Sequence, residues 1–416
     1  MVTEVRLPNP SRGGRMGHDQ AGQLPVTPVV SVPAVPPPLS LYIHLPWCLR
    51  KCPYCDFNSH ELRGAVPAER YVESLVADLE QSLPQVWGRT VQSIFIGGGT
   101  PNLFVPAQID RLLVAVRARL RLAPMAEVTL EANPAAVREE SADWLAYKQA
   151  GVTRVSVGVQ SFDGPSLQAL GRMHDPDQAV AAVEGAVAVF DRVNLDLMYG
   201  LPEQTPEKAH ADLTQALRLG VGHLSLYQLT LEPNTLFAVR PPSLPHEDAI
   251  WEMQTALVET LERAGLSRYE VSAYARAGQR CQHNLNYWQF GDYLGIGAGA
   301  HSKLSLPEQG ILRQWCLRQP QGYQQAVARA DGSHRQSQTV AARDLGFEYM
   351  LNGLRLVEGI PISGFTERTG RPAEDLLSGV ARAQARGLLL AVDGHWRATA
   401  RGFDFLNELQ ALFLPA

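Results

Sequence analysis

Residues 40–60 read SLYIHLPWCLRKCPYCDFNSH, a stretch that joins a predicted strand to three closely spaced thiols. The thiols follow the strand at the spacing C-x3-C-x2-C: Cys48, Cys52 and Cys55. Three thiolates on one loop can bind three irons of a cubane cluster and leave the fourth iron open to an external ligand. The alternative is a zinc ion, with His44 or His60 completing a tetrahedral set of ligands.

From residue 39 onward, short β-rich segments alternate with segments of helical period. The predicted strands are residues 40–45, 91–97, 127–133, 154–160, 193–200 and 223–229. Between them, residues 68–85 and 106–122 repeat apolar side chains at three- and four-residue steps, as the buried face of a helix does. Such strand–helix units predict an α/β fold with a parallel sheet, either open and doubly wound or barrel-like. The periodicity does not separate these two arrangements.

Polar features occur near the ends of the predicted strands. They are Cys48, the turn GGGTP at residues 97–101, Glu131, Gln160 and Asp196. Asp196 lies within an apolar strand, where its carboxylate needs a partner to offset burial. Because ligands collect at the carboxyl ends of the strands in both α/β arrangements, we expect a binding site there.

The composition of the 416 residues excludes several classes of protein. A formal charge of −5 and a pI near 6.1 provide no global basic field, so no nucleic-acid partner is expected. Apolar runs end well before the ~20 residues that span a bilayer, and the N-terminus lacks a signal-peptide core. We therefore expect a cytoplasmic protein without a transmembrane segment. The 5 cysteines favour reduced thiolates over a disulfide framework.

The chain is predicted to have three parts. Residues 1–38 contain a run of prolines that fits neither a helix nor a sheet interior, so we interpret them as a disordered arm. Residues 39–300 contain the strand–helix units. Residues 301–416 are mainly helical and end in a helix, a short hairpin and a helix, which is a winged-helix-like pattern.

The cysteine motif, with Tyr54 just before its third thiol, resembles the cluster motif of radical S-adenosylmethionine (SAM) enzymes. The resemblance implies a partial (β/α)6 TIM-like barrel with a 4Fe-4S cluster on the three cysteines. It also implies that the amino and carboxylate groups of SAM bind the open iron. The missing fourth protein ligand would then be the cofactor itself.

The same resemblance implies a set of SAM-contacting residues. They are Tyr42, Gly98, Gly99, Thr100, Glu131, Gln160, Arg172 and Asp196. Their chemistry is suitable, because carboxylates accept hydrogen bonds from ribose hydroxyls or an ammonium group, and arginine pairs with a carboxylate. The structural alternative is that the glycine turn only ends a strand and that each charged residue forms an ion pair or a cap.

Further motifs resemble the oxygen-independent coproporphyrinogen III oxidase-like branch of this superfamily. They are YIHLPWC, IGGGTPNLF, EANP, VSVGVQSF, LDLMYGLPEQT, LYQLTLEPNT and HNLNYWQFGDYLGIGAGAH. The oxidases of this branch carry an additional cysteine where this chain has Phe57. The HemW-type haem chaperones instead have CDF at this point together with an H-N-x-x-Y-W signature, and both are present here. In that signature His283 is a candidate haem ligand, whereas the structural alternative is a buried packing motif.

The leading hypothesis is therefore a haem chaperone that binds haem, a 4Fe-4S cluster and SAM and passes haem to an acceptor haemoprotein. The alternative is coproporphyrinogen III oxidase, an enzyme that would draw electrons from a donor such as a reduced flavodoxin. A tetracarboxylate substrate would need several basic side chains, and the one that the motifs assign to the pocket, Arg172, is already assigned to SAM. No catalytic residue is assigned.

Overall fold

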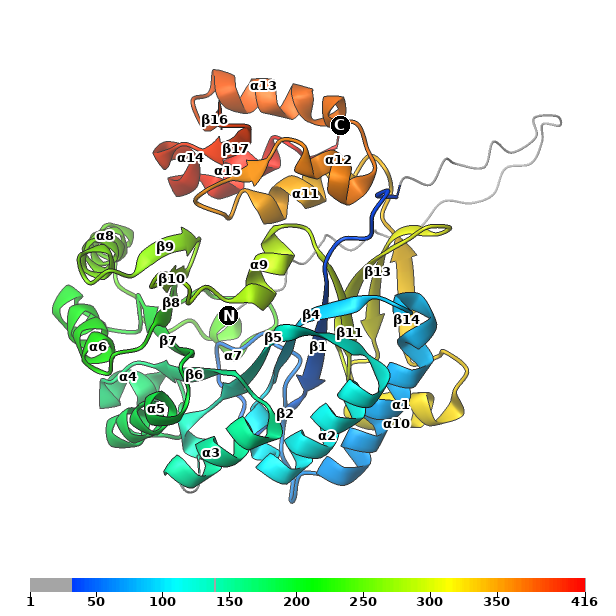
Figure 1. The fold of residues 1–416 in the computed structure, drawn as a ribbon. Coiled ribbons are helices and arrows are strands. Elements are labelled where there is room, and N and C mark those ends of the chain that lie inside the picture. The colour runs from blue at the N-terminus through cyan, green and yellow to red at the C-terminus, as the bar shows by residue number, and fades with distance from the viewer. Residues whose placement is uncertain (1–31, 138–139, 416) are drawn as a thin grey trace, which may run out of the picture.

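The computed structural model describes residues 32–137 and 140–415, and a sheet of 12 strands forms its centre. Six parallel strands lie side by side in chain order (Figure 1): β1 (Leu39–Leu45), β4 (Thr90–Gly98), β5 (Arg121–Ala132), β6 (Arg154–Gln160), β7 (Val193–Tyr199) and β8 (His223–Gln228). These strands are the six that the sequence predicts.

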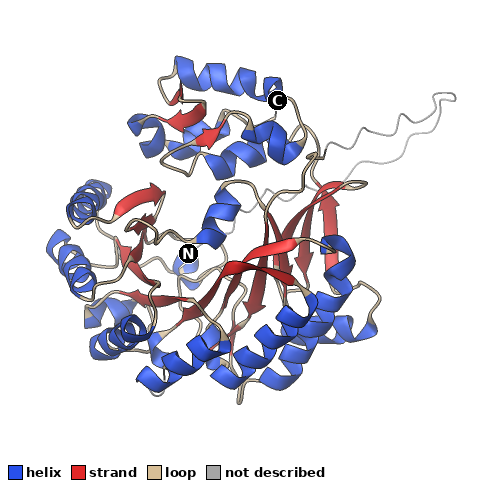
Figure 2. Cartoon of the chain, viewed as in Figure 1, coloured by secondary structure: helices blue, strands red, loops and turns tan. Residues whose placement is uncertain are grey.

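Helices cover the outer face of this sheet (Figure 2). The principal ones are α1 (Ala68–Val86), α2 (Pro106–Arg119), α3 (Glu140–Ala150), α5 (Pro176–Val189), α6 (Pro206–Arg218) and α8 (Glu247–Arg263). Because each parallel strand lies next to its predecessor, all the right-handed crossovers place their helices on one face. A doubly wound sheet would reverse its strand order, so the partial barrel is confirmed. The sheet stays open, with β14 (Arg335–Thr339) and β9 (Ser267–Glu270) at its two edges.

Shorter elements connect or extend these units. They are β2 (Trp47–Cys48), β3 (His60–Glu61), α4 (Gly164–Ala169), α7 (Leu236–Val239), β10 (Ala273–Ala275), and the 3-10 turns at Pro101–Leu103 and Pro134–Ala136. Within the described ranges, no helix has both the length and the apolar character that crossing a membrane requires.

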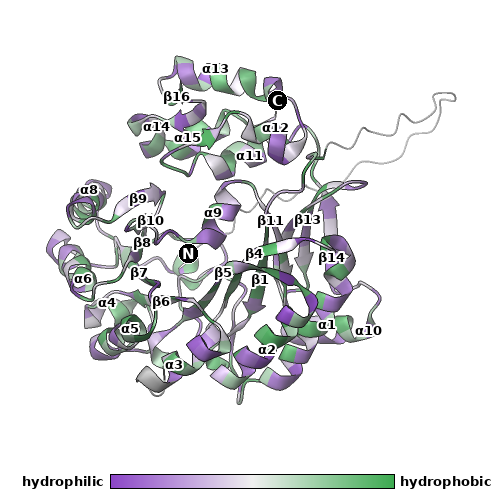
Figure 3. Ribbon diagram, viewed as in Figure 1, coloured by the Kyte–Doolittle hydropathy of each residue, from purple (hydrophilic) through white to green (hydrophobic). Residues whose placement is uncertain are grey.

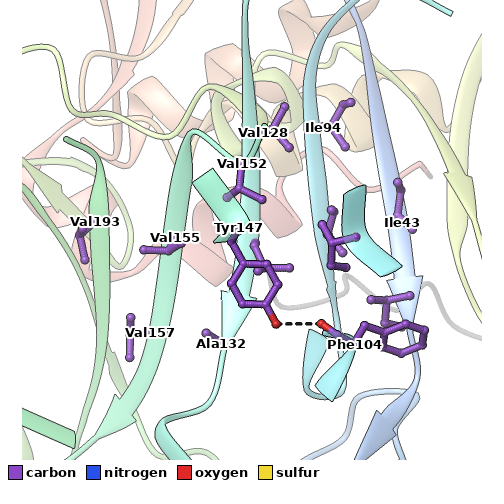
Figure 4. Close-up of a cluster of buried hydrophobic side chains, with 14 of the residues drawn as sticks. Ile43, Ile94, Phe104, Val128, Ala132, Tyr147, Val152, Val155, Val157 and Val193 are labelled. Carbon is purple, nitrogen blue, oxygen red and sulfur yellow. Dashed lines mark hydrogen bonds between the residues drawn. The ribbon is translucent and has the colours of Figure 1, made fainter. Parts of the chain in front are cut away.

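The two faces of the parallel strands differ in polarity because alternate residues point in opposite directions. Outward residues such as Ile43, Ile94 and Val155 are fully buried beneath the helices and form the main core (Figure 4). Tyr147 of α3 extends this core and donates a hydrogen bond of 2.8 Å to the carbonyl of Phe104. The helix ribbons alternate hydrophobic and hydrophilic residues (Figure 3), as expected of helices that bury one face against a sheet.

Inward residues of the same strands are largely polar. Ser40 and Ser93 share a hydrogen bond of 2.8 Å between β1 and β4. The Nδ1 of His223 donates a hydrogen bond of 2.6 Å to the Asn194 side-chain oxygen, and its Nε2 lies 2.8 Å from the Tyr269 hydroxyl. A buried polar group is costly unless it is paired, so these networks fix the strands from inside as the hydrophobic core fixes them from outside.

The sheet continues beyond β1 through segments that the sequence analysis did not predict as strands. They are β11 (Asp292–Ile296), β12 (His301–Leu306), β13 (Gly310–Cys316) and β14, with α10 (Pro320–Arg329) packed nearby. β11 is parallel to β1, and β12 to β14 are antiparallel. The buried carboxylate of Asp292 joins this extension to the barrel, because it pairs with Lys303 at 2.9 Å and Arg89 at 2.8 Å.

A separate hydrophobic core lies in the C-terminal unit, drawn in orange and red in Figure 1. Its elements are α11 (Leu345–Gly353), β15 (Ile360–Pro361), α12 (Gly364–Thr369), the 3-10 turn Ala373–Leu376, α13 (Leu377–Ala385), β16 (Leu389–Val392), β17 (His395–Ala398), α14 (Ala400–Asp404) and α15 (Leu406–Ala411). The β16–β17 hairpin between helices confirms the winged-helix-like pattern.

The division predicted between residues 300 and 301 crosses the large sheet, since β12 to β14 belong to it. We therefore propose a boundary near residue 340, where the second core begins to dominate. Of the arm of residues 1–38 that was predicted to be disordered, residues 1–31 lie outside the described residues. Residues 32–38 contact the protein: Arg89 donates a hydrogen bond of 2.5 Å to the carbonyl of Pro37.

A buried carboxylate on α1 connects α1 to the sheet extension. Asp78 is 0% exposed and accepts hydrogen bonds from the Arg335 guanidinium at 2.7 Å, the His334 imidazole at 3.0 Å and the Tyr323 hydroxyl at 2.6 Å. Burial alone would raise the pKa of Asp78, but Arg335 and His334 outweigh it and hold that pKa well below its usual range.

Replacing Asp78 by alanine should therefore lower the free energy of unfolding by about 3–5 kcal/mol, because the change leaves a buried arginine without its counter-charge. Chemical denaturation of the purified protein measures this loss. Asp110→Ala, an exposed carboxylate on α2, is the matched control and should change stability by less than about 0.5 kcal/mol. Equal effects of the two substitutions would contradict this account of Asp78.

Candidate functional site

The cysteine loop begins at the carboxyl end of β1 and is closed by its own backbone. β2 and β3 pair in parallel, with Trp47 opposite His60. The Cys55 amide donates to the Cys52 carbonyl at 3.1 Å, and the Leu62 amide donates to the Cys48 carbonyl at 2.8 Å. The first bond closes a turn between Cys52 and Cys55, and the second ties Cys48 to the end of the loop, so all three cysteines lie on one compact loop.

The three thiols lie close enough to influence one another. Burial raises the pKa of Cys48, which Cys52 raises further, and hydrogen bonds from Thr100 and Ser59 oppose this effect. Burial also raises the pKa of Cys55 to about 11. Thiols with raised pKa values need a nearby positive charge to ionise, and a bound metal centre supplies one. Among the described residues, no three Cys, His, Asp or Glu side chains are arranged closely enough to form a metal site, so the cluster on these three cysteines stays a prediction.

The histidines of the zinc alternative are already engaged in hydrogen bonds. The His44 Nε2 donates to the Asn58 carbonyl at 2.9 Å, and its Nδ1 is 2.9 Å from the Tyr42 hydroxyl. Nε2 of His60 lies 3.2 Å from the Arg318 carbonyl. These contacts hold both rings against backbone carbonyls, so the three cysteines without a histidine stay the predicted donor set.

The glycine turn after β4 holds the cysteine loop against the barrel. A Cβ on Gly99 would lie 2.4 Å from the Trp47 carbonyl oxygen, and one on Gly98, whose φ is +120°, would lie 2.7 Å from the His44 ring. The Thr100 amide donates to the Trp47 carbonyl at 2.7 Å. Close backbone packing therefore requires these glycines, and their contact with SAM stays a prediction.

Two carboxylates, Glu131 near the end of β5 and Asp196 in the middle of β7, lie close enough for Asp196 to influence the pKa of Glu131. Glu131 accepts a hydrogen bond of 3.1 Å from the Gly98 amide, while Asp196 accepts one of 2.8 Å from the Asn194 side chain. Burial and the nearby Asp196 together raise the pKa of Glu131 to about 7. A ligand that brings hydroxyl or ammonium donors, or a positive charge, would stabilise this pair.

Gln160 and Arg172 complete the same end of the barrel. Gln160 has a φ of 73°, unusual for a residue with a side chain, and accepts a 2.5 Å hydrogen bond from the Tyr227 hydroxyl. Arg172 donates to the Gly158 carbonyl at 2.5 Å and lies 3.8 Å from the Cys52 sulfur. Its Nε is buried without a hydrogen-bond partner among the described residues, which fits a carboxylate-bearing ligand.

His283 lies apart from this cluster, inside the barrel on α9 (Gln282–Trp288). It is 1% exposed, and both ring nitrogens are engaged, Nδ1 with Ser93 at 3.0 Å and Nε2 with Tyr287 at 2.9 Å. Burial lowers the pKa of His283 to about 3. An iron atom would have to displace one of these two hydroxyls, so haem ligation by His283 stays a prediction.

The predicted residues thus form one group and one outlier. The cysteines, the glycine turn, Glu131, Gln160, Arg172 and Asp196 meet at the carboxyl ends of the strands. Tyr42 lies between this group and His283, since its ring is 6.4 Å from the His283 ring and its hydroxyl bonds to His44. Tyr227, Asn194 and Ser59 also contact the site, although the sequence did not predict them. Asn194 and Tyr227 could have been found from the alternation of β7 and β8, because every second residue of these strands points into the barrel.

Two protein families match parts of the chain. The family described as the Radical SAM superfamily matches residues 42–215, and the HemN C-terminal domain matches residues 340–405. The first range contains the cysteine loop and every predicted SAM-contacting residue. The second range begins where the second hydrophobic core takes over.

Relatives cover nearly the whole chain. It is 49% identical to the haem chaperone HemW of Escherichia coli over 380 residues, which are 91% of this chain and 98% of the relative. Identity to HemW of Mycobacterium tuberculosis is 35%, over 84% of this chain and 90% of the relative. The solved structure of Escherichia coli coproporphyrinogen III oxidase (HemN) is 23% identical, with a TM-score of 0.77 over 91% of this chain and 90% of the other. That likeness establishes the fold.

Asp196→Asn should lower the pKa of Glu131 from about 7 toward its ordinary value, because the substitution removes the neighbouring negative charge. The carboxyl stretching band in infrared spectra between pH 5 and 9 measures it, and Glu131→Gln identifies the band by removing it. An unchanged titration in Asp196→Asn would show that the two carboxylates are not coupled.

Proposed function

Because the chain belongs to the HemW family of haem chaperones, within the radical SAM superfamily, we propose that it binds haem and delivers it to an acceptor haemoprotein. The near-full-length similarity to HemW proteins carries this proposal. Phe57 supports it, since a phenylalanine stands where the resemblance to the oxidases calls for an additional cysteine. Arg172 is the one arginine assigned to the SAM pocket, and a substrate with four carboxylates would need several, which also favours a role other than coproporphyrinogen oxidation.

The family implies a 4Fe-4S cluster and SAM, and the residues present fit both. Cys48, Cys52 and Cys55 would hold the cluster. Glu131 and Asp196 would accept hydrogen bonds from the bound nucleotide, and the unpartnered Nε of Arg172 would donate to its carboxylate. When bound, this pair of cofactors supplies one-electron chemistry or a ligand-dependent signal that gates haem release.

An electron donor of the reduced flavodoxin type belongs to the same proposal. Arg50 and Lys51 are exposed on the cysteine loop and give the approach to the cluster a positive surface. Positive surface of this kind accelerates encounter with an acidic partner. We place the protein in the cytoplasm, because all five cysteines are free and a reducing compartment preserves thiolates.

The cluster assignment is tested by exchanging Cys48, Cys52 and Cys55 for serine together. After anaerobic reconstitution, the natural chain should hold about four irons with matching sulfide, and the triple variant should hold essentially none. Iron and sulfide analysis with absorption spectroscopy measures both. Cys281→Ser is the control, because this buried thiol lies outside the loop and should leave the iron content unchanged. Stoichiometric zinc in the natural chain would contradict the cluster.

The function itself is tested with the reconstituted protein in two parallel assays. Haem-loaded protein should transfer haem to an apo-haemoprotein, seen as recovery of the acceptor's Soret spectrum. The same preparation, given coproporphyrinogen III, SAM and a reductant, should form no protoporphyrinogen. Turnover of coproporphyrinogen without haem transfer would replace the chaperone proposal with the oxidase.

A further inference from the structure

A groove of about 650 Å³ lies between the open side of the barrel and the C-terminal unit. The cysteine loop contributes Tyr54 to its lining, the barrel contributes Trp251 and Tyr274, and the C-terminal unit contributes Phe403 and Phe405. Its volume is in the range of small-molecule and cofactor sites. One end of the groove therefore lies next to the candidate cluster site, and one of its walls belongs to the C-terminal unit, which has its own hydrophobic core.

The walls of this groove present flat apolar surface, part of it open to solvent. Trp251 is 54% exposed and Phe405 is 50% exposed, although side chains of this size are normally covered. Trp251 lies on α8, and Phe405 lies between α14 and α15. Exposed aromatic surface that lines a concave site marks a place where an apolar ligand binds.

One cation in the groove lacks a counter-charge. The Arg268 guanidinium lies 4.5 Å from the centre of the Phe403 ring and 5.8 Å from that of Tyr274. Its hydrogen bonds within the described chain go to one neutral acceptor, the Val271 carbonyl. The other lining arginine, Arg355, is neutralised by Glu270 at 3.1 Å. Arg268 is thus the group in the groove that is suited to an anionic ligand.

Acidic side chains elsewhere in the lining restrict how such a ligand is oriented. They are Asp56, Glu232, Asp404 and Glu408. Carboxylates of a ligand are repelled from these positions and attracted to Arg268. A flat apolar molecule with carboxylates at one edge therefore has one favourable orientation in the groove.

We propose that this groove is the haem-binding site, with the macrocycle along the aromatic walls and its propionates at Arg268. The inference rests on the proposed function and gives it a location. The groove is open to solvent, whereas His283 is enclosed and has both ring nitrogens engaged. The end of the groove formed by Tyr54 and Phe57 places the haem next to the cysteine loop.

Haem titration of the full-length protein, followed by the Soret band, tests this location. Arg268→Gln should weaken binding about tenfold or more, because it removes a charge-assisted contact. Trp251→Ala, a half-exposed position that does not depend on core packing, should weaken it several-fold. Arg263→Gln, an exposed arginine on the same helix as Trp251, is the matched control and should bind like the natural chain.

A second ligand separates the contribution of the propionates at Arg268 from that of the macrocycle on the aromatic walls. The dimethyl ester of haem lacks free carboxylates, so its affinity should not respond to Arg268→Gln, while Trp251→Ala should still weaken it. Metal-free protoporphyrin IX should compete with haem, because the groove holds the macrocycle and propionates rather than the iron.

The outcomes distinguish this inference from the proposed function. Failure of the natural chain to bind haem would overturn the proposed function. Normal haem binding by both groove variants would overturn the groove location and leave the proposed function standing. Loss of binding confined to His283→Ala would place haem on the motif of α9 and also overturn the groove.

Discussion

The packing of the crossover helices between the parallel strands on one face of the sheet is the constraint on which the interior depends. Because those helices cover only the outer face, the inner face must satisfy its own polar side chains. Ser93 does so by linking Ser40 to His283, and Asn194 does so by linking Asp196 to His223. Toward the carboxyl ends these networks reach the carboxylates of Glu131 and Asp196 and the Arg172 side chain, whose Nε has no hydrogen-bond partner in the described part of the chain. A ligand bound at that edge can donate hydrogen bonds to the carboxylates and accept one from the arginine.

The cysteine loop is positioned by segments that are far apart in the sequence. Gly99 allows the Trp47 carbonyl to approach the end of β4, and Arg172 reaches the Cys52 sulfur from beyond β6. Asn58 donates hydrogen bonds to the Ala298 and Arg318 carbonyls at 2.9 and 3.0 Å, so the sheet extension also holds the loop. A site fixed from several directions keeps its geometry when a ligand binds or leaves.

The sequence predicted the parallel strands well because their outer residues are apolar at alternate positions and segments of helical period lie between the strands. It did not predict β11, since the segment Asp292–Ile296 is short and contains a glycine, and its pairing with β1 depends on the buried Asp292 and on contacts across the fold. The cysteine loop could be identified from spacing alone. The coupling of Glu131 to Asp196 could not, because it arises when two separate strands become neighbours.

The H-N-x-x-Y-W segment shows why a motif does not by itself locate a ligand. Its His283 and Tyr287 bond to each other inside the barrel, while Trp288 packs in the core of the C-terminal unit and stacks under the Arg355 guanidinium at 4.2 Å. The motif therefore connects the barrel to the unit that forms one wall of the groove. A protein that must release its ligand benefits from a site between two cores rather than inside one, because a small shift of one unit uncovers the ligand without unfolding the barrel.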